Sequence, residues 1–123
     1  MAVPRITKED LKARLEGDPA TLPVILDARL KYPYEHSTLT LPGAVRVNPD
    51  ALDTSGLSTD RDVVAYDSDL EELVSARVAA ALIRQGYRAS ALKGGLPEWV
   101  TAKFPTDAKD APMQAPPKAG ELK

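Results

Sequence analysis

The 123-residue chain contains no cysteine and only one histidine, His36. The absence of cysteine excludes disulfide bonds, thiolate metal sites and every mechanism in which this chain supplies a thiolate or persulfide nucleophile. A single histidine excludes a histidine-rich metal site. Any chemistry performed by this chain alone therefore depends on carboxylates, hydroxyls, basic side chains and backbone groups.

The sequence also lacks a long hydrophobic run and a strong charge imbalance. No stretch approaches the ~20 apolar residues of a membrane-spanning helix, and the opening residues, MAVPRITKED, do not form an apolar signal segment. The 16 basic and 18 acidic residues give a formal net charge of −2, which predicts neither nucleic-acid binding nor attraction to an anionic membrane. We therefore expect a cytoplasmic protein.

The composition indicates one folded domain followed by a tail. Hydrophobic residues make up 43% of the chain and charged residues 28%, which is typical of globular proteins. A chain of this length suits a single hydrophobic core. After Phe104 the sequence becomes rich in proline, alanine and lysine. We expect a folded domain over residues 1–105 and a flexible tail over 106–123.

Short apolar runs alternate with helical patterns along the domain. The patterns predict helices at 8–16, 70–85 and 96–103, a loop or short helix at 31–41, and strands at 23–29, 44–47, 62–66 and 87–95. Alternation of this kind implies parallel pairing with right-handed crossovers. The predicted class is α/β, with an open, mostly parallel sheet of about five short strands flanked by helices.

The helix at 70–85 carries a stripe of apolar side chains that we expect to face the core. Its members are Leu70, Leu73, Val74, Val78, Ala81 and Leu82. Trp99, in the last helix, has spacing that favours core packing over stacking on a ligand.

The carboxyl ends of the predicted strands carry polar residues. Asp27, Asp67 and Lys93 all lie at such ends, and open α/β sheets bind ligands at this edge. Gly94 and Gly95 predict a tight turn in which a glycine adopts a positive φ angle. Lys93 is alternatively placed to neutralise Asp67. This edge of the sheet is the candidate site.

Asp67 begins an acidic loop that continues through Ser68, Asp69, Glu71 and Glu72. We favour a structural role, in which Asp67 caps the next helix and the other acids form its solvated start. Alternatively, the loop contacts a ligand or holds a divalent cation, because hard cations bind several carboxylate oxygens. A third interpretation makes Asp67 a phosphate-accepting carboxylate, since VVAYDSD resembles the start of haloacid-dehalogenase-type phosphotransferases.

An ordered set of motifs resembles the rhodanese-like domain family over roughly residues 5–105. The motifs are VILDAR at 24–29, YE at 34–35, LPGA at 41–44, VVAYD at 63–67 and ALKGGLPEW at 91–99. The resemblance implies a rhodanese-like sheet. It also implies that Arg29, beside Asp27, pairs with Glu35 and shapes the mouth of the site, together with the turn at Gly94 and Gly95.

Active members of this family carry a cysteine after the central strand, where it accepts sulfur as a persulfide. This chain has Asp67 at that position, and a carboxylate oxygen cannot carry sulfane sulfur in that redox role. The acidic loop also repels anionic substrates. The resemblance therefore implies an inactive type with no enzyme activity, no cofactor and no metal.

The expected role is a binding, regulatory or scaffold module with an unknown protein partner. Nucleic acid and membrane are not among the expected partners. Two alternatives stay open at this point. One is an Asp67-centred domain that accepts phosphate or binds a cation, and the other is a sulfur-transfer accessory that acts with a cysteine of its partner.

Overall fold

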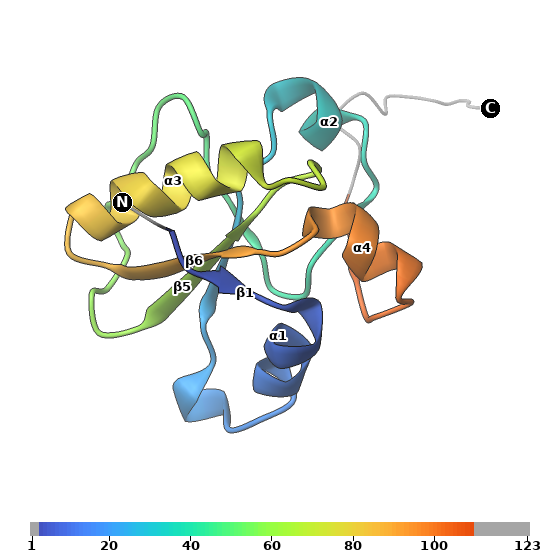
Figure 1. The fold of residues 1–123 in the computed structure, drawn as a ribbon, viewed down its shortest axis with the longest axis horizontal. Coiled ribbons are helices and arrows are strands. Elements are labelled where there is room, and N and C mark those ends of the chain that lie inside the picture. The colour runs from blue at the N-terminus through green and yellow to red at the C-terminus, as the bar shows by residue number, and fades with distance from the viewer. Residues whose placement is uncertain (1–2, 110–123) are drawn as a thin grey trace.

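The computed structural model describes residues 3–109, and its centre is a five-stranded sheet in the order β1-β6-β5-β2-β4. All neighbouring strands in this sheet are parallel (Figure 1). The strands are β1 Arg5–Ile6, β2 Val24–Asp27, β4 Val45–Arg46, β5 Asp62–Tyr66 and β6 Arg88–Leu92. The predicted α/β class with a parallel sheet of about five short strands is confirmed.

Helices cover both faces of the sheet, and a further short helix lies near its carboxyl end. Helix α3 (Leu73–Arg84) packs on one face, and α1 (Lys8–Leu15) and α4 (Gly95–Thr101) pack on the other (Figure 1). Helix α2 (Lys31–Glu35) follows β2, and the 3-10 turn η1 (Pro19–Thr21) precedes it. None of the helices within residues 3–109 is long and apolar enough to cross a membrane.

The central strand β5 is buried on both faces. Val63 and Ala65 join the apolar cluster beneath α3, whereas Val64 and Tyr66 join the cluster beneath α1 and α4. Successive side chains of a strand point to opposite faces, so the unbroken apolar run DVVAY supplies both cores at once. Trp99 is fully buried in the second cluster, which confirms its predicted packing role.

Helix α3 begins at Leu73, three residues later than predicted. The residue before it, Glu72, adopts a left-handed conformation with φ of 56°, which interrupts the helical path. The prediction that Leu70 and Leu73 face the core is therefore wrong, because their side chains are 58% and 66% exposed. The buried face of α3 consists of Ser75, Val78, Ala79 and Leu82.

Paired structure continues beyond residue 105, where we expect the domain to end. Strand β7 (Asp107–Ala108) pairs antiparallel with β3 (Leu39–Thr40) in a separate two-stranded sheet. The Asp107 carboxylate also accepts a bond of 2.9 Å from the backbone N–H of Gly43. The rest of the expected tail, 110–123, lies outside the described residues.

A buried ion pair closes the carboxyl end of β2. Arg29 donates from Nε and Nη2 to the two carboxylate oxygens of Asp27, at 2.9 and 2.6 Å, and both residues are 1% exposed. Burial lowers the pKa of Arg29, but the hydrogen bond and the charge of Asp27 outweigh burial and raise it overall. Arg29 also donates to the carbonyl of Leu39 at 3.1 Å, which ties β2 to β3.

The Arg29–Glu35 pair implied by the family resemblance is not formed within the described structure. Asp27 is two residues from Arg29 and presents both of its oxygens to the guanidinium. This bidentate geometry satisfies the arginine without a partner from α2. The buried pair at the end of β2 takes the place of the longer-range pair that we expected.

We predict that Arg29→Gln lowers the free energy of unfolding by about 3 kcal/mol, because it leaves the buried Asp27 carboxylate without its cation. Urea denaturation at pH 7 measures the change. The control is Arg77→Gln, since Arg77 pairs with Asp50 at the surface and is 53% exposed. The control should cost at most about 1 kcal/mol, and equal losses in the two variants would contradict the assignment.

Candidate functional site

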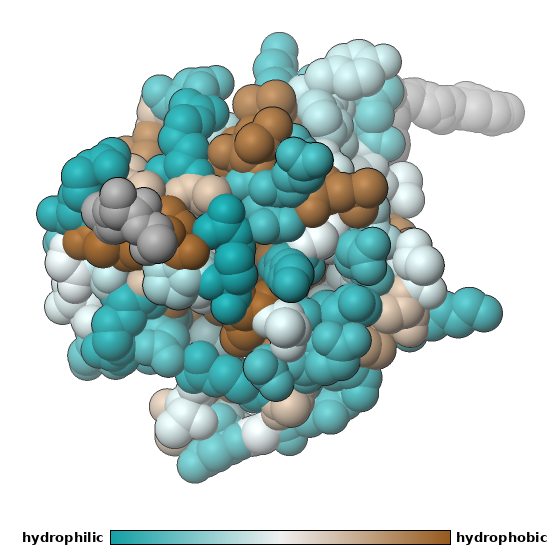
Figure 2. Space-filling model, viewed as in Figure 1, coloured by the Kyte–Doolittle hydropathy of each residue, from teal (hydrophilic) through white to brown (hydrophobic). Residues whose placement is uncertain are grey.

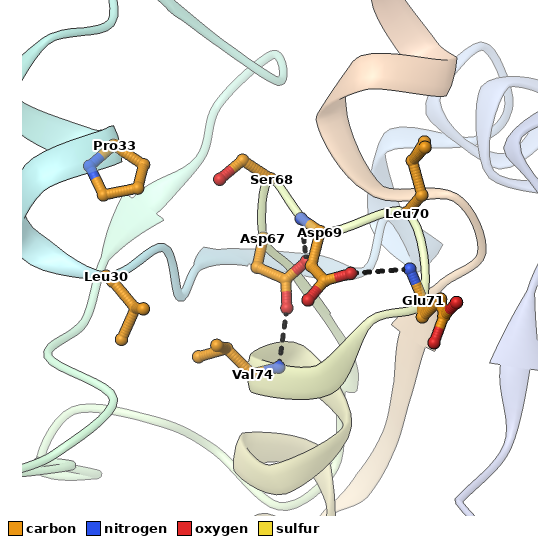
Figure 3. Close-up of a pocket in the computed structure, with 8 residues that line it drawn as sticks. All are labelled: Leu30, Pro33, Asp67, Ser68, Asp69, Leu70, Glu71 and Val74. Carbon is orange, nitrogen blue, oxygen red and sulfur yellow. Dashed lines mark hydrogen bonds between the residues drawn. The ribbon is translucent and has the colours of Figure 1, made fainter.

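A crevice of about 570 Å³ opens beside the carboxyl end of β5, between α2 and the loop that leads to α3. Its lining consists of Leu30, Pro33, Asp67, Ser68, Asp69, Leu70, Glu71 and Val74 (Figure 3). Four of these, Asp67, Ser68, Asp69 and Glu71, belong to the acidic loop singled out from the sequence. The crevice lies at the sheet edge where open α/β folds place their ligands.

The Asp67 carboxylate occupies the N-terminal end of α3. Its Oδ2 accepts the backbone N–H groups of Val74 at 2.9 Å and Ser75 at 2.6 Å, and its Oδ1 accepts that of Asp69 at 2.8 Å (Figure 3 draws the bonds to Val74 and Asp69). The side chain is 1% exposed. Val74 and Ser75 are the second and third residues of α3, whose N–H groups an N-cap side chain normally accepts.

Asp67 thus performs the capping role from the end of β5. Glu72, the residue directly before α3, makes no side-chain cap bond. A helix N-terminus attracts negative charge through its free N–H groups and its dipole. Here the protein's own carboxylate supplies that charge, so an external anion would have to displace three hydrogen bonds to enter.

The rim of the crevice adds further negative charge. Asp69 and Glu71 line it beside Asp67, and the Asp69 carboxylate accepts the N–H of Glu71 at 2.8 Å. Among the residues that the structure describes, no lysine, arginine or histidine lines this crevice. The arrangement opposes entry of thiosulfate, phosphate or another small anion, because like charges repel most strongly where solvent is partly excluded.

Glu72 points away from the crevice and into the fold. Its two carboxylate oxygens accept from Arg5 Nε at 2.8 Å and from the backbone N–H of Gly94 at 2.9 Å, and the residue is 8% exposed. These bonds join β1, the loop and the start of α4. They offset the ~1–2 kcal/mol that a left-handed conformation costs a non-glycine residue. The expectation of a solvated acidic run is therefore wrong for Asp67 and Glu72.

The glycine pair before α4 presses directly against the Asp67 loop. Gly94 and Gly95 have φ angles of 80° and 63°, as their predicted turn requires. A Cβ atom on Gly95 would lie 2.7 Å from the carbonyl oxygen of Asp67 and 2.9 Å from that of Asp69. The same Asp67 carbonyl accepts the N–H of Leu96 at 2.9 Å. The absence of a side chain at Gly95 allows this close approach.

The remaining predicted residues lie outside the crevice. Lys93 lines a separate pocket with Glu72 and Gly94, and no ion pair joins it to Asp67 within the described part of the chain. Asp27 and Arg29 form their pair at the end of β2, and Glu35 ends α2. Backbone N–H groups, and not Lys93, are therefore what compensates the Asp67 carboxylate.

The acidic loop does not assemble a metal site within residues 3–109. No group of three or more histidine, aspartate or glutamate residues there is arranged to hold a metal ion. Asp67 binds backbone N–H groups and Glu72 binds Arg5. These bonds divert two of the acids that the cation hypothesis requires and leave Asp69 and Glu71 at the rim.

Two groups with shifted pKa values have structural surroundings. Burial raises the pKa of Tyr66, whose hydroxyl accepts the backbone N–H of Leu41 at 3.3 Å. Burial, together with the charge of Arg29, lowers the pKa of Lys109. The ammonium group of Lys109 lies 4.3 Å from the ring centre of Tyr34. Neither Tyr66 nor Lys109 lines the crevice.

The apolar lining of the crevice is what the sequence analysis missed. Leu30 and Pro33 come from the segment that the sequence predicts only as a loop or short helix, and Leu70 and Val74 were assigned to a core-facing stripe. The available signal was topological, because Leu30 follows the end of β2 as Leu70 follows the end of β5. Neighbouring parallel strands bring the loops at their carboxyl ends together.

Comparison with known proteins identifies the family of the chain. A family model described as Rhodanese-like domain matches residues 7–102. No curated protein matches the sequence. Among solved structures, a protein from Bacillus halodurans is 17% identical with a TM-score of 0.75, and the match covers 85% of this chain and 77% of that one.

Two further structures carry family names in their descriptions. A rhodanese-like domain protein from Staphylococcus aureus is 24% identical with a TM-score of 0.63, over 78% of this chain and 90% of that one. A thiosulfate sulfurtransferase from Pseudomonas aeruginosa is 22% identical with a TM-score of 0.66, over 88% of this chain but only 20% of that one. At these identities the likeness extends to the fold alone.

We predict that Asp67→Ala lowers the free energy of unfolding by about 2 kcal/mol, because three backbone donors lose a charged acceptor. The matched control is Asp69→Ala, which removes one bond at a more exposed turn and should cost about 0.5 kcal/mol. Urea denaturation of both variants at pH 7 gives the comparison. A cost for Asp67→Ala no greater than that of the control would show that the cap is not important for stability.

We predict that Gly95→Ala destabilises the fold more than Gly56→Ala does. Both glycines have positive φ angles, but a Cβ on Gly56 meets no atom within 4 Å, whereas one on Gly95 meets two carbonyl oxygens. The shared backbone strain cancels in the comparison, and the clash at Gly95 adds about 1–3 kcal/mol. Thermal unfolding of the two variants measures the difference, and matching midpoints would refute the close approach.

Proposed function

The chain belongs to the rhodanese-like domain family, whose model covers residues 7–102, and we propose that it is a non-catalytic member that binds a protein partner. The family resemblance drawn from the sequence motifs is confirmed. The inactive type and the binding role are the proposal. Its main support is the Asp67 carboxylate, which fills the N–H cradle at the start of α3.

Sulfur transfer through a protein persulfide needs a sulfur atom that both accepts and donates sulfane sulfur. The chain has no cysteine, so it supplies no such atom. The cradle that would receive an anionic group is occupied by a carboxylate from the chain itself. Asp69 and Glu71 at the rim add charge of the same sign. Each of these features opposes sulfurtransferase chemistry independently of the others.

The binding role is supported by the surface that surrounds the filled cradle. The crevice keeps a volume of about 570 Å³, although its floor lacks the family's nucleophile. Leu30 and Leu70 line it with 43% and 58% of their surface exposed. An apolar, concave surface that lacks a reactive group suits recognition of another molecule better than catalysis.

The surroundings of Asp67 do not favour phosphate acceptance. Both carboxylate oxygens already accept backbone N–H groups, and the side chain is 1% exposed. Phosphoryl transfer also needs cations to neutralise the charge that develops on the phosphoryl oxygens. None of the crevice-lining residues that the structure describes is a cation. The proposed binding function accounts for these features without a reaction.

We predict that the full chain forms no more thiocyanate from thiosulfate and cyanide than its heat-denatured control. Colorimetric detection of thiocyanate measures the rate. Asp67→Cys alone should stay near this background, because Asp69 and Glu71 still repel thiosulfate. Adding Asp69→Asn and Glu71→Gln to that variant should raise the rate. Turnover by the unchanged chain would overturn the proposal, and high activity of Asp67→Cys alone would overturn the charge argument.

A further inference from the structure

We propose that the crevice between α2 and the Asp67 loop binds a partner segment that carries a large apolar side chain next to a lysine or arginine. This inference rests on the proposed binding function and specifies the chemistry of the partner. The apolar walls and the acidic rim support it separately.

The walls of the crevice expose apolar side chains from two elements. Leu30 and Pro33 contribute one wall, and Leu70 and Val74 contribute to the other. Figure 3 shows the Leu30 and Val74 side chains directed toward one another across the opening. A concave site of this kind gains most from an apolar group that removes both walls from water.

Apolar atoms are gathered on this part of the surface. Figure 2 shows hydrophobic side chains near the N-terminal end of α3 and beside α2, surrounded by hydrophilic atoms. Leu73, next to Val74, is 66% exposed. Exposed apolar patches with a polar rim are typical of interaction sites in soluble proteins. The burial that α3 lacks on this side is therefore available to a partner.

The acidic rim determines the charge of that partner. Asp69 and Glu71 line the crevice, and neither forms an ion pair within residues 3–109. Asp67 keeps its charge inside the helix cap and adds to the negative potential. Charge complementarity across an interface favours a cation and disfavours an anion. A lysine or arginine beside the apolar anchor satisfies both features of the crevice.

The same charges oppose pairing of this surface with itself. In a symmetric dimer formed by two crevices, the Asp69 and Glu71 rims of both copies would face one another, because such an interface joins identical patches. Like charges facing one another across an interface are destabilising. A different protein segment with basic residues is therefore the occupant that the crevice fits.

The proposal is tested by random-peptide display against the immobilised full chain. Peptides that bind Leu30→Ser/Leu70→Ser equally well are removed by counter-selection. Both leucines are partly exposed, so this variant should remain folded, which circular dichroism checks. The enriched peptides should combine a leucine, isoleucine, methionine or phenylalanine with an adjacent lysine or arginine.

One enriched peptide is then synthesised and its affinity measured by fluorescence anisotropy. We expect at least tenfold weaker binding by Leu30→Ser/Leu70→Ser, and no change for Val100→Ser, a control for an exposed apolar residue elsewhere. Asp69→Asn/Glu71→Gln should weaken binding and reduce its dependence on salt. Amide shifts in NMR spectra of the full chain should be largest at 30–33 and 68–74.

Enrichment of peptides without basic residues, failure to enrich any peptide, or shifts centred elsewhere would overturn the inference. Tighter peptide binding by the full-length variant Met113→Ser/Leu122→Ser would assign the crevice to residues 110–123 of the chain itself and would also overturn it. The thiocyanate assay decides the non-catalytic function separately. Peptide binding outside the crevice would preserve the binding role and reject only this site.

Discussion

The contact between the Asp67 carboxylate and the first N–H groups of α3 is the interaction on which the rest of the site depends. It joins the end of the central strand to the start of the helix that covers one face of the sheet. One charged side chain satisfies three backbone donors and keeps other anions away from them. The same contact gives α3 its cap and supports a non-catalytic role.

The loop around this contact is held from both sides. Glu72 adopts a left-handed conformation and binds Arg5 and the backbone of Gly94, whereas Gly95 lets α4 approach the carbonyl groups of the loop. The conformation therefore depends on β1 and α4, which are distant from the loop in sequence. Because Glu72 turns inward and Leu70 stays outside the helix, the rim combines acidic and apolar groups. That combination supports recognition of a basic, apolar segment.

Much of the fold followed from patterns in the sequence. The run DVVAY has the bounds of β5, and the predicted strands at 23–29 and 87–95 contain β2 and β6. Long apolar runs and glycine turns depend on local chemistry, so they could be predicted. The short strands β1, β3 and β7 were not predicted, because two-residue strands carry no periodic signal and form only where a distant partner provides hydrogen bonds.

The sequence by itself determined the parallel α/β fold, the absence of a sulfur nucleophile and the acidic character of the loop after β5. These properties reside in residue types and local periodicity. Only the tertiary structure decided which acids cap, which bind Arg5 and which line the crevice, and that Arg29 pairs with Asp27 rather than Glu35. The reason is that a carboxylate's role depends on the donors brought near it, and here most of those donors come from other elements of the fold.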